Sequence, residues 1–150
     1  MSLRVLVDAD ACPVKDEIYK VAKRHRAGVT VVSNAWLRIP EDPSIERVMV
    51  SDRFDAADDW IAEHAGADSV VVTSDILLAG RCLEAGAAVL APNGKPFTQD
   101  SIGGAIATRA LMADLRAGGE QLGGPPPFGK TDRSNFLQAL DQVLVRLTRR

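Results

Sequence analysis

Aspartates follow two apolar stretches of this sequence, and others open a helix-like stretch between them. Asp8 ends "LRVLVD" (3–8), Asp10 comes two residues later, and Asp75 directly follows "SVVVTS" (69–74). Asp58 lies in "AADDWIA" (56–62). Carboxylates that share one crevice repel each other unless a cation is present. Mg²⁺ and Mn²⁺ prefer such oxygen ligands, and either ion could activate water against a phosphate ester.

Several of these acids also have a purely structural explanation. Asp75 precedes "ILLA" and could cap a helix, as could Asp55 before "AADDWI". Asp58 and Asp59 would favour the first turn of a helix through its dipole alone. No cap explains Asp8 and Asp10, so the group taken together favours a metal site.

The elements that would position the acids follow from the pattern of apolar residues. Five short runs, nearly continuous in Val, Leu and Ala, are typical of strands buried on both faces of a parallel sheet; they lie at 3–8, 29–34, 46–51, 69–74 and 87–92. Helical patterns at 13–26, 55–66 and 75–86 separate most of them. This alternation predicts an α/β fold with a central parallel five-stranded sheet flanked by helices. Residues 35–45 contain two prolines and predict an irregular connection.

Two further helices are expected after the fifth strand. One covers about 98–117, with Ile102, Ile106, Ala110 and Leu115 facing inward, and the other covers about 132–148. Between them, the Gly- and Pro-rich segment 118–129 predicts a loop. The length of 150 residues suits one domain, which we expect to span 1–150.

The expected topology brings the acids to one edge of the sheet. Ligands of open parallel sheets bind beyond the carboxyl ends of the strands, where the strand order reverses. Right-handed crossovers place the first strand centrally, with 69–74 beside it. Asp8 should then face Asp75, and the helix that begins near Asp55 should start from the same edge.

Composition places limits on the class of protein. No apolar run approaches the length of a membrane span, and the start of the chain lacks a signal-peptide pattern, so we expect a cytoplasmic protein with no membrane partner. The two cysteines have no spacing typical of a zinc site. The net charge of −2 does not by itself indicate nucleic-acid binding. Of the two tryptophans, which could stack on bases, Trp60 is expected in the core and Trp36 is expected to be more open.

The chain resembles known families in these same stretches. "TSDILLA" (73–79) is similar to the Thr-x-Asp and following apolar helix of the PIN-like nuclease superfamily. The whole chain looks still closer to the YaiI/YqxD family of bacterial proteins. The stretches that carry this likeness are "VDADACPVK", "FDAADDWIA", "VVTSDILLA", "VLAPNGKPFT" and "GPPPFGKTDRSNFLQALD".

The resemblance to PIN-like nucleases implies a Mg²⁺- or Mn²⁺-dependent hydrolysis of RNA. Asp8, Asp58 and Asp75 would then hold the metal ion and be catalytic, with Asp10 as a direct or water-mediated ligand.

Other residues would support this chemistry. Thr73 or Ser74 could orient the metal-bound water, Asp55 adds a further acid at the same rim, and Lys15 in the first helix could meet a phosphate. Lys130 and Arg133 could contact the nucleic-acid backbone.

Two alternatives stay open. PIN-like nucleases commonly carry a further acid soon after the position of Asp75, whereas here the next acid is Glu84. This departure favours a PIN-like module that binds RNA or a protein without cleaving it. The Asp8-Ala9-Asp10 sequence also fits haloacid-dehalogenase-like phosphatases, with Thr73 and Lys95 in supporting roles. In that family, however, the last metal acids follow the threonine, whereas Asp58 and Asp59 precede it.

Overall fold

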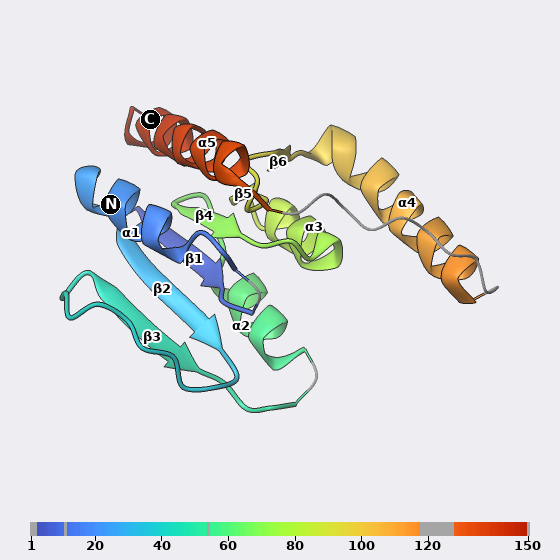
Figure 1. The fold of residues 1–150 in the computed structure, drawn as a ribbon, viewed down its shortest axis with the longest axis horizontal. Helices are drawn as coiled ribbons and strands as arrows, with labels where there is room; N and C mark the ends of the chain where they lie inside the picture. The colour runs from blue at the N-terminus through green and yellow to red at the C-terminus, as the bar shows by residue number, and fades with distance from the viewer. Residues whose placement is uncertain (1–2, 11, 54, 118–127, 150) are drawn as a thin grey trace.

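A six-stranded sheet forms the centre of the protein, seen in a computed structural model that describes residues 3–10, 12–53, 55–117 and 128–149 (Figure 1). The strands lie in the order β3-β2-β1-β4-β5-β6. Their bounds are β1 Arg4–Asp8, β2 Gly28–Ser33, β3 Ile45–Met49, β4 Ser69–Val72, β5 Ala88–Leu90 and β6 Pro96–Phe97. β1 to β5 are parallel, and β6 runs antiparallel to β5. The predicted α/β fold with five parallel strands and a central first strand is confirmed.

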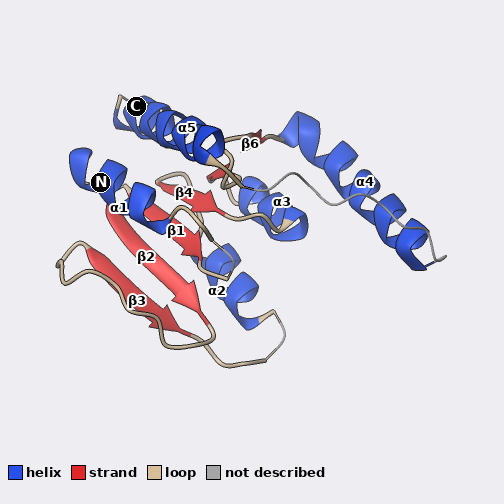
Figure 2. Ribbon diagram, in the orientation of Figure 1, coloured by secondary structure: helices blue, strands red, loops and turns tan. Residues whose placement is uncertain are grey.

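The helices cover both faces of this sheet (Figure 2). They are α1 Lys15–Arg24, α2 Ala56–His64, α3 Ile76–Glu84, α4 Gln99–Ala117 and α5 Lys130–Thr148. Val5 and Val7 of β1 pack in a core with α1 and α5, whereas Leu6 packs in a second core with α2 and α3. Successive side chains of a strand point to opposite faces, so the central strand contributes to both cores.

The edges of the sheet differ from the sequence prediction. A sixth strand, β6, was not predicted; a turn over Ala91–Lys95, closed by a hydrogen bond from Ala91 N to Lys95 O, returns the chain along β5. β3, predicted as a buried strand, is an edge strand with half-buried and exposed residues only. Both differences arise at sheet edges, where fewer neighbours impose an apolar pattern.

The two C-terminal helices pack differently from each other. Phe136, Leu140 and Leu144 of α5, which covers the predicted helix at about 132–148, are fully buried on the α1 side. α4 instead extends away from the body of the protein (Figure 1). Of its residues predicted to face inward, Ile102 and Leu115 are half-buried but Ile106 and Ala110 are exposed. That prediction was wrong for these two, because α4 packs mainly against α3 and leaves most of its described side chains exposed.

Two further expectations concern membrane-spanning helices and the predicted loop at 118–129. The part of the chain that the structure describes contains no helix long and apolar enough to cross a membrane. Residues 118–127 of the predicted loop lie outside the described residues.

Candidate carboxylate site

Asp8 and Thr73 connect the carboxyl ends of β1 and β4. The two strands pair in parallel, with Val7 beside Val72, so the residues that follow lie next to each other. The buried Thr73 hydroxyl donates a hydrogen bond to Asp8 Oδ2 at 2.8 Å and accepts one from Asp75 N at 3.0 Å. One hydroxyl therefore orients the Asp8 carboxylate and fixes the backbone at Asp75.

Asp75 caps α3, as the sequence suggested. Its Oδ1 accepts hydrogen bonds from Leu77 N at 3.0 Å and Leu78 N at 3.1 Å. Both bonds go to the same oxygen. The cap therefore orients this carboxylate and leaves its other oxygen to face other groups.

Asp58 lies in the first turn of α2, in a partly buried position. Burial, followed by the charges of Asp75, Asp8 and Asp55, raises the pKa of Asp58 from 3.8 to about 6, and Arg81 opposes this rise. Asp8 and Asp75 lie at the carboxyl ends of the neighbouring strands β1 and β4, so their charges act on Asp58 from one edge of the sheet. Acids from the ends of β1 and β4 and from the first turn of α2 are therefore gathered at the same edge of the sheet.

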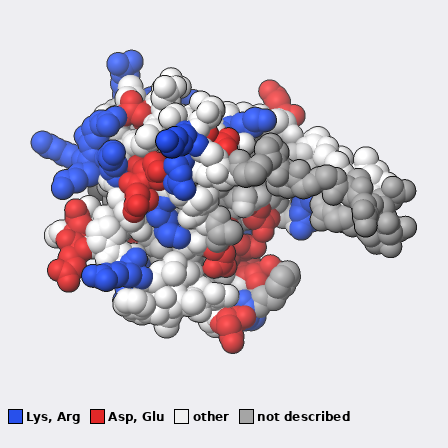
Figure 3. Space-filling model, in the orientation of Figure 1, with Lys and Arg blue, Asp and Glu red and all other residues white. Residues whose placement is uncertain are grey.

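The electrostatics of Asp8 agree with this arrangement. Burial raises the pKa of Asp8, the hydrogen bond from Thr73 lowers it, and the charges of Asp10 and Asp75 raise it further. Asp10 itself is exposed, two residues beyond the end of β1. Figure 3 shows acidic side chains gathered near the starts of α2 and α3.

Asp59, the neighbour of Asp58, is paired with cations instead. Its Oδ1 accepts a hydrogen bond from Arg81 Nη1 at 3.0 Å, and its Oδ2 accepts one from Arg53 Nη2 at 3.3 Å. These bonds, the one from Arg81 first, lower the pKa of Asp59. The two adjacent aspartates thus differ: one faces other acids and the other forms ion pairs.

Asp55 occupies the N-cap position of α2 but does not cap with its side chain. Its backbone is left-handed, with φ 68°, and its side chain is exposed. A side-chain cap normally requires an extended backbone at this position, so the capping explanation of Asp55 was wrong. Its charge contributes to the site through Asp58.

The predicted supporting residues lie in different surroundings. Ser74 is exposed between Thr73 and Asp75, and Lys130 is exposed at the start of α5. Lys15 is the first residue of α1, and its Nζ donates a hydrogen bond to Cys12 O at 3.2 Å.

Arg133 joins α5 to the start of α1. Its Nη1 donates hydrogen bonds to Pro13 O at 2.6 Å and Glu17 Oε1 at 3.1 Å, and its guanidinium stacks on Phe128. The structure thus gives Arg133 a packing role, and a phosphate contact stays a prediction.

The donor chemistry of the site suits a hard divalent cation, although its geometry is open. Within the residues that the structure describes, no three His, Cys, Asp or Glu side chains converge closely enough to hold a metal ion together. Mg²⁺ commonly binds through one or two carboxylates and keeps several waters. Asp8 with Asp58 or Asp75 would be the candidate pair; burial, followed by the charges of neighbouring acids, raises the pKa of Asp58 there.

Sequence reasoning missed the role of Arg81. This exposed residue lies on α3, five residues after Ile76, and its Nη1 pairs with Asp59 of α2 at 3.0 Å. Its only signal in the sequence was one arginine within a mainly apolar helix, and a lone arginine is also typical of a side chain that simply faces solvent.

Comparison with known proteins agrees with the resemblance seen in the sequence. A model of the uncharacterized YaiI/YqxD family matches residues 6–146. The chain belongs to the YaiI/YqxD family. A UPF0178 protein of Sphingopyxis alaskensis is 73% identical over 146 residues, covering 97% of this chain and 95% of that protein. UPF0178 proteins of Nitrobacter winogradskyi and Bradyrhizobium diazoefficiens are 58% and 61% identical, covering 94% and 88% of those proteins. No solved structure matches this YaiI/YqxD chain.

Proposed function

We propose that this protein is a Mg²⁺- or Mn²⁺-dependent nuclease that hydrolyses RNA at Asp8, Asp58 and Asp75, with Asp10 at the rim. The observation that carries the proposal is that acids from three separate segments lie at one edge of the sheet, where burial first, and then the charges of Asp75 and Asp8, raise the pKa of Asp58 to about 6. A protein that only needed caps and solvated strand ends would not bring these carboxylates together, because their repulsion costs stability.

The residues of the chain have distinct tasks in this proposal. A bound divalent cation would supply charge neutralisation at the phosphate and an acidified water. Thr73 holds one oxygen of Asp8, and the α3 backbone holds one oxygen of Asp75. Two carboxylates are thereby presented in fixed orientations, and Asp58 adds a third negative charge opposite them.

A second function, binding RNA without cleaving it, is favoured by one specific observation. No three acidic, His or Cys side chains of the described residues converge for a metal ion, and 76–83 contain no acid to complete a tighter set. In that case Asp8, Asp58 and Asp75 would form part of a binding surface and would not catalyse hydrolysis. The phosphatase alternative has weaker support, because Thr73 is buried and already bonded to Asp8.

Metal binding and cleavage test the proposal together. Calorimetric titration of Mn²⁺, to millimolar concentration, should show binding to the wild type that weakens at least about tenfold in Asp75→Asn, a difference of about 1.4 kcal/mol. Asparagine also caps helices, so this substitution removes charge while keeping the cap. Asp59→Asn is the matched control, because its carboxylate is already paired with Arg53 and Arg81.

Cleavage is then measured on a short, end-labelled single-stranded RNA with Mn²⁺. The wild type and Asp59→Asn should cut it, EDTA should stop the reaction, and Asp8→Asn should be inactive. Cleavage that persists in EDTA would contradict the proposal. Metal binding without cleavage of any single-stranded RNA would instead favour the binding module.

A further inference from the structure

The connection between β2 and β3, residues 34–44, presents an outward-facing tryptophan. Exposure alternates along it: Trp36 and Arg38 are exposed, whereas Leu37 and Ile39 are half-buried against the core on the α1 side. This alternation is that of an extended chain. Leu37 and Ile39 therefore anchor the connection, and Trp36 and Arg38 point together toward solvent.

The Trp36 ring is held in place although it is exposed. The guanidinium carbon of Arg47, on β3, lies 4.8 Å from the ring centroid. Arg47 Nη1 also donates a hydrogen bond to Leu37 O at 3.0 Å, which ties the stack to the connection. Trp36 nevertheless keeps 63% of its surface exposed. An indole fixed beforehand loses little freedom when another ring stacks on it.

The surroundings of Trp36 are hollowed and carry two arginines and two acids. A hollow of about 590 Å³ is lined by Trp36, Arg38, Arg47 and the chain around Pro40. Glu41 and Asp42 also line it, and the Asp42 carboxylate accepts hydrogen bonds from Ser44 N and Ser44 Oγ.

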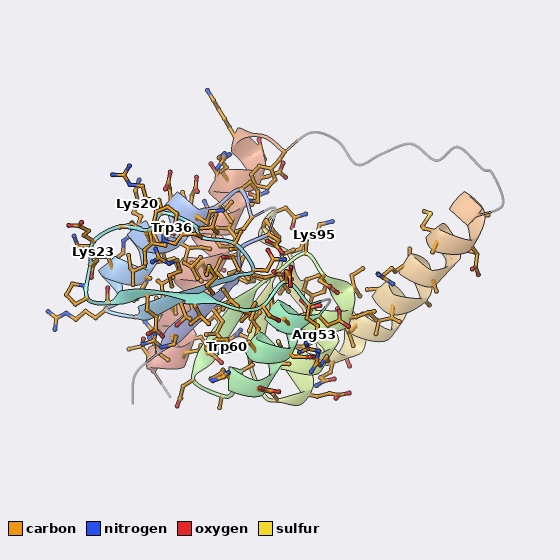
Figure 4. The ribbon with its side chains drawn as sticks, turned by 90° about the horizontal axis from the view of Figure 1, so that it is seen from below. Lys20, Lys23, Trp36, Arg53, Trp60 and Lys95 are labelled. Atoms are coloured by element: carbon orange, nitrogen blue, oxygen red, sulfur yellow. The ribbon has the colours of Figure 1, made fainter. Side chains whose placement is uncertain are left out.

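Lysines of α1 give the two hollows together an excess of basic side chains, four against Glu41 and Asp42. Lys20 and Lys23 line the adjoining hollow, which shares Pro40 and Asp42 with the first. Figure 4 shows Lys20, Lys23 and Trp36 on the same side of the molecule. In Figure 3, Lys and Arg side chains gather over α1, apart from the acids near the starts of α2 and α3.

We infer that Trp36 and Arg47 form a platform on which one base of a single-stranded RNA stacks, with Arg38, Lys20 and Lys23 facing the phosphates. The choice of RNA as ligand rests on the proposed function; the platform itself rests on the contacts above. Aromatic rings beside cations bind single-stranded nucleic acids in this way because every base has a face to stack. Bases in a duplex are already stacked, so the platform selects unpaired RNA.

The position of the platform fits one strand that also reaches the carboxylates. Val32 of β2 is the register partner of Asp8, and Trp36 follows four residues later. Four residues span at most about 14 Å of chain. A short single strand could therefore place a base on Trp36 and a phosphate near Asp8.

Binding without cleavage tests this inference. A labelled single-stranded RNA is titrated with protein in EDTA at low salt, followed by fluorescence anisotropy. Trp36→Ala should weaken binding about 5- to 150-fold, the range of one lost base stack. Trp36→Phe should restore part of the affinity, and Arg47→Gln should weaken it.

The second tryptophan gives a matched control. Trp60 is partly buried on α2 and stacks on His64 at 3.7 Å, so Trp60→Phe should leave RNA affinity unchanged. In Trp60→Phe, RNA should also quench the fluorescence that remains, which comes from Trp36. Circular dichroism checks that each variant is folded.

Three outcomes would overturn the inference: no RNA binding by the wild type, equal binding by Trp36→Ala, or equal affinity for duplex RNA. If the wild type is a dimer and Trp36→Ala is a monomer, Trp36 contacts a second protein chain and not a base of RNA. The nuclease proposal fails separately. RNA binding through Trp36 without metal-dependent cleavage contradicts only the nuclease, whereas cleavage with an unchanged KM in Trp36→Ala contradicts only the platform.

Discussion

The Thr73 hydroxyl donates a 2.8 Å hydrogen bond to Oδ2 of Asp8, a residue 65 positions away in sequence. This bond joins the two strand ends at the centre of the sheet, and the same hydroxyl accepts from Asp75 N. It therefore couples the orientation of one acid to the backbone of another.

Removing this hydroxyl should cost stability. Thr73→Val keeps the shape of the buried side chain but leaves Asp75 N and the Asp8 carboxylate without a partner. We expect a loss of about 1–3 kcal/mol and a melting temperature lower by several degrees. Thr73→Ser keeps the hydroxyl and should lose less. Equal melting temperatures for the two variants in thermal denaturation would show that the bond contributes nothing.

Neutralising Asp58 should stabilise the protein near neutral pH. Its pKa of about 6 lies above the ordinary 3.8, so the folded state binds more protons than the unfolded state between these values. The contribution of Asp58 to stability is therefore greatest below about pH 4 and falls as the pH rises through 6. The full shift corresponds to about 3 kcal/mol, and solvent screening reduces it to about 1 kcal/mol.

We accordingly expect Asp58→Asn to raise the melting temperature by about 2–4 °C at pH 7.5 and to have little effect near pH 4. Asp59→Asn is the control and should lower it at pH 7.5, because it breaks pairs with Arg53 and Arg81. Melting curves across this pH range give both results. A destabilised Asp58→Asn at pH 7.5 would mean that the acids do not repel each other.

Asp141 should stabilise the contact of α5 with α1. Its Oδ1 lies 2.6 Å from His25 Nε2 and 3.3 Å from Arg24 Nη1, and the hydrogen bond with His25 is the main cause that lowers the pKa of Asp141. A lowered carboxyl pKa adds stability above the ordinary value of 3.8, and this stability is lost as the pH falls through the folded pKa.

Asp141→Asn should therefore lower the melting temperature by about 1–4 °C at neutral pH, the range for exposed ion pairs, and by less near pH 3. Asp114→Asn, on the exposed part of α4, serves as the control and should change little. If Asp141→Asn lowers the melting temperature equally at both pH values, the lost contribution comes from packing rather than from charge.

Gly94 fixes the turn between β5 and β6 against α5. Its φ is +90°, and a Cβ there would lie 2.7 Å from the carbonyl carbon and oxygen of Asn135. Gly94→Ala should destabilise the protein by at least about 1–3 kcal/mol, through backbone strain and this clash. A Cβ at Gly66 has no atom within 4 Å, so Gly66→Ala should lower the free energy of unfolding much less. Urea denaturation of both variants checks the comparison, and equal midpoints would contradict it.

Much of the fold could be predicted because its signals are local. The runs at 3–8 and 69–74 have wholly apolar centres, VLV at 5–7 and VVV at 70–72, and this is typical of strands covered on both faces. Parallel pairing then brings Asp8 and Asp75 to one edge without further information. β6 escaped prediction because a two-residue strand that contains a proline has no apolar period of its own.

The composition of the carboxylate site was determined by the sequence, but its electrostatics were decided by the tertiary structure. Asp58 and Asp59 are chemically identical neighbours, and each residue turns a helix by about 100°. Which of them faces Asp8 and which meets Arg81 depends on how α2 docks beside α3, and local sequence does not fix that docking angle. The sequence identified Trp36 as a residue able to stack on bases. Only the tertiary structure, in which the β2–β3 connection packs beside Arg47, holds its ring in place at the surface.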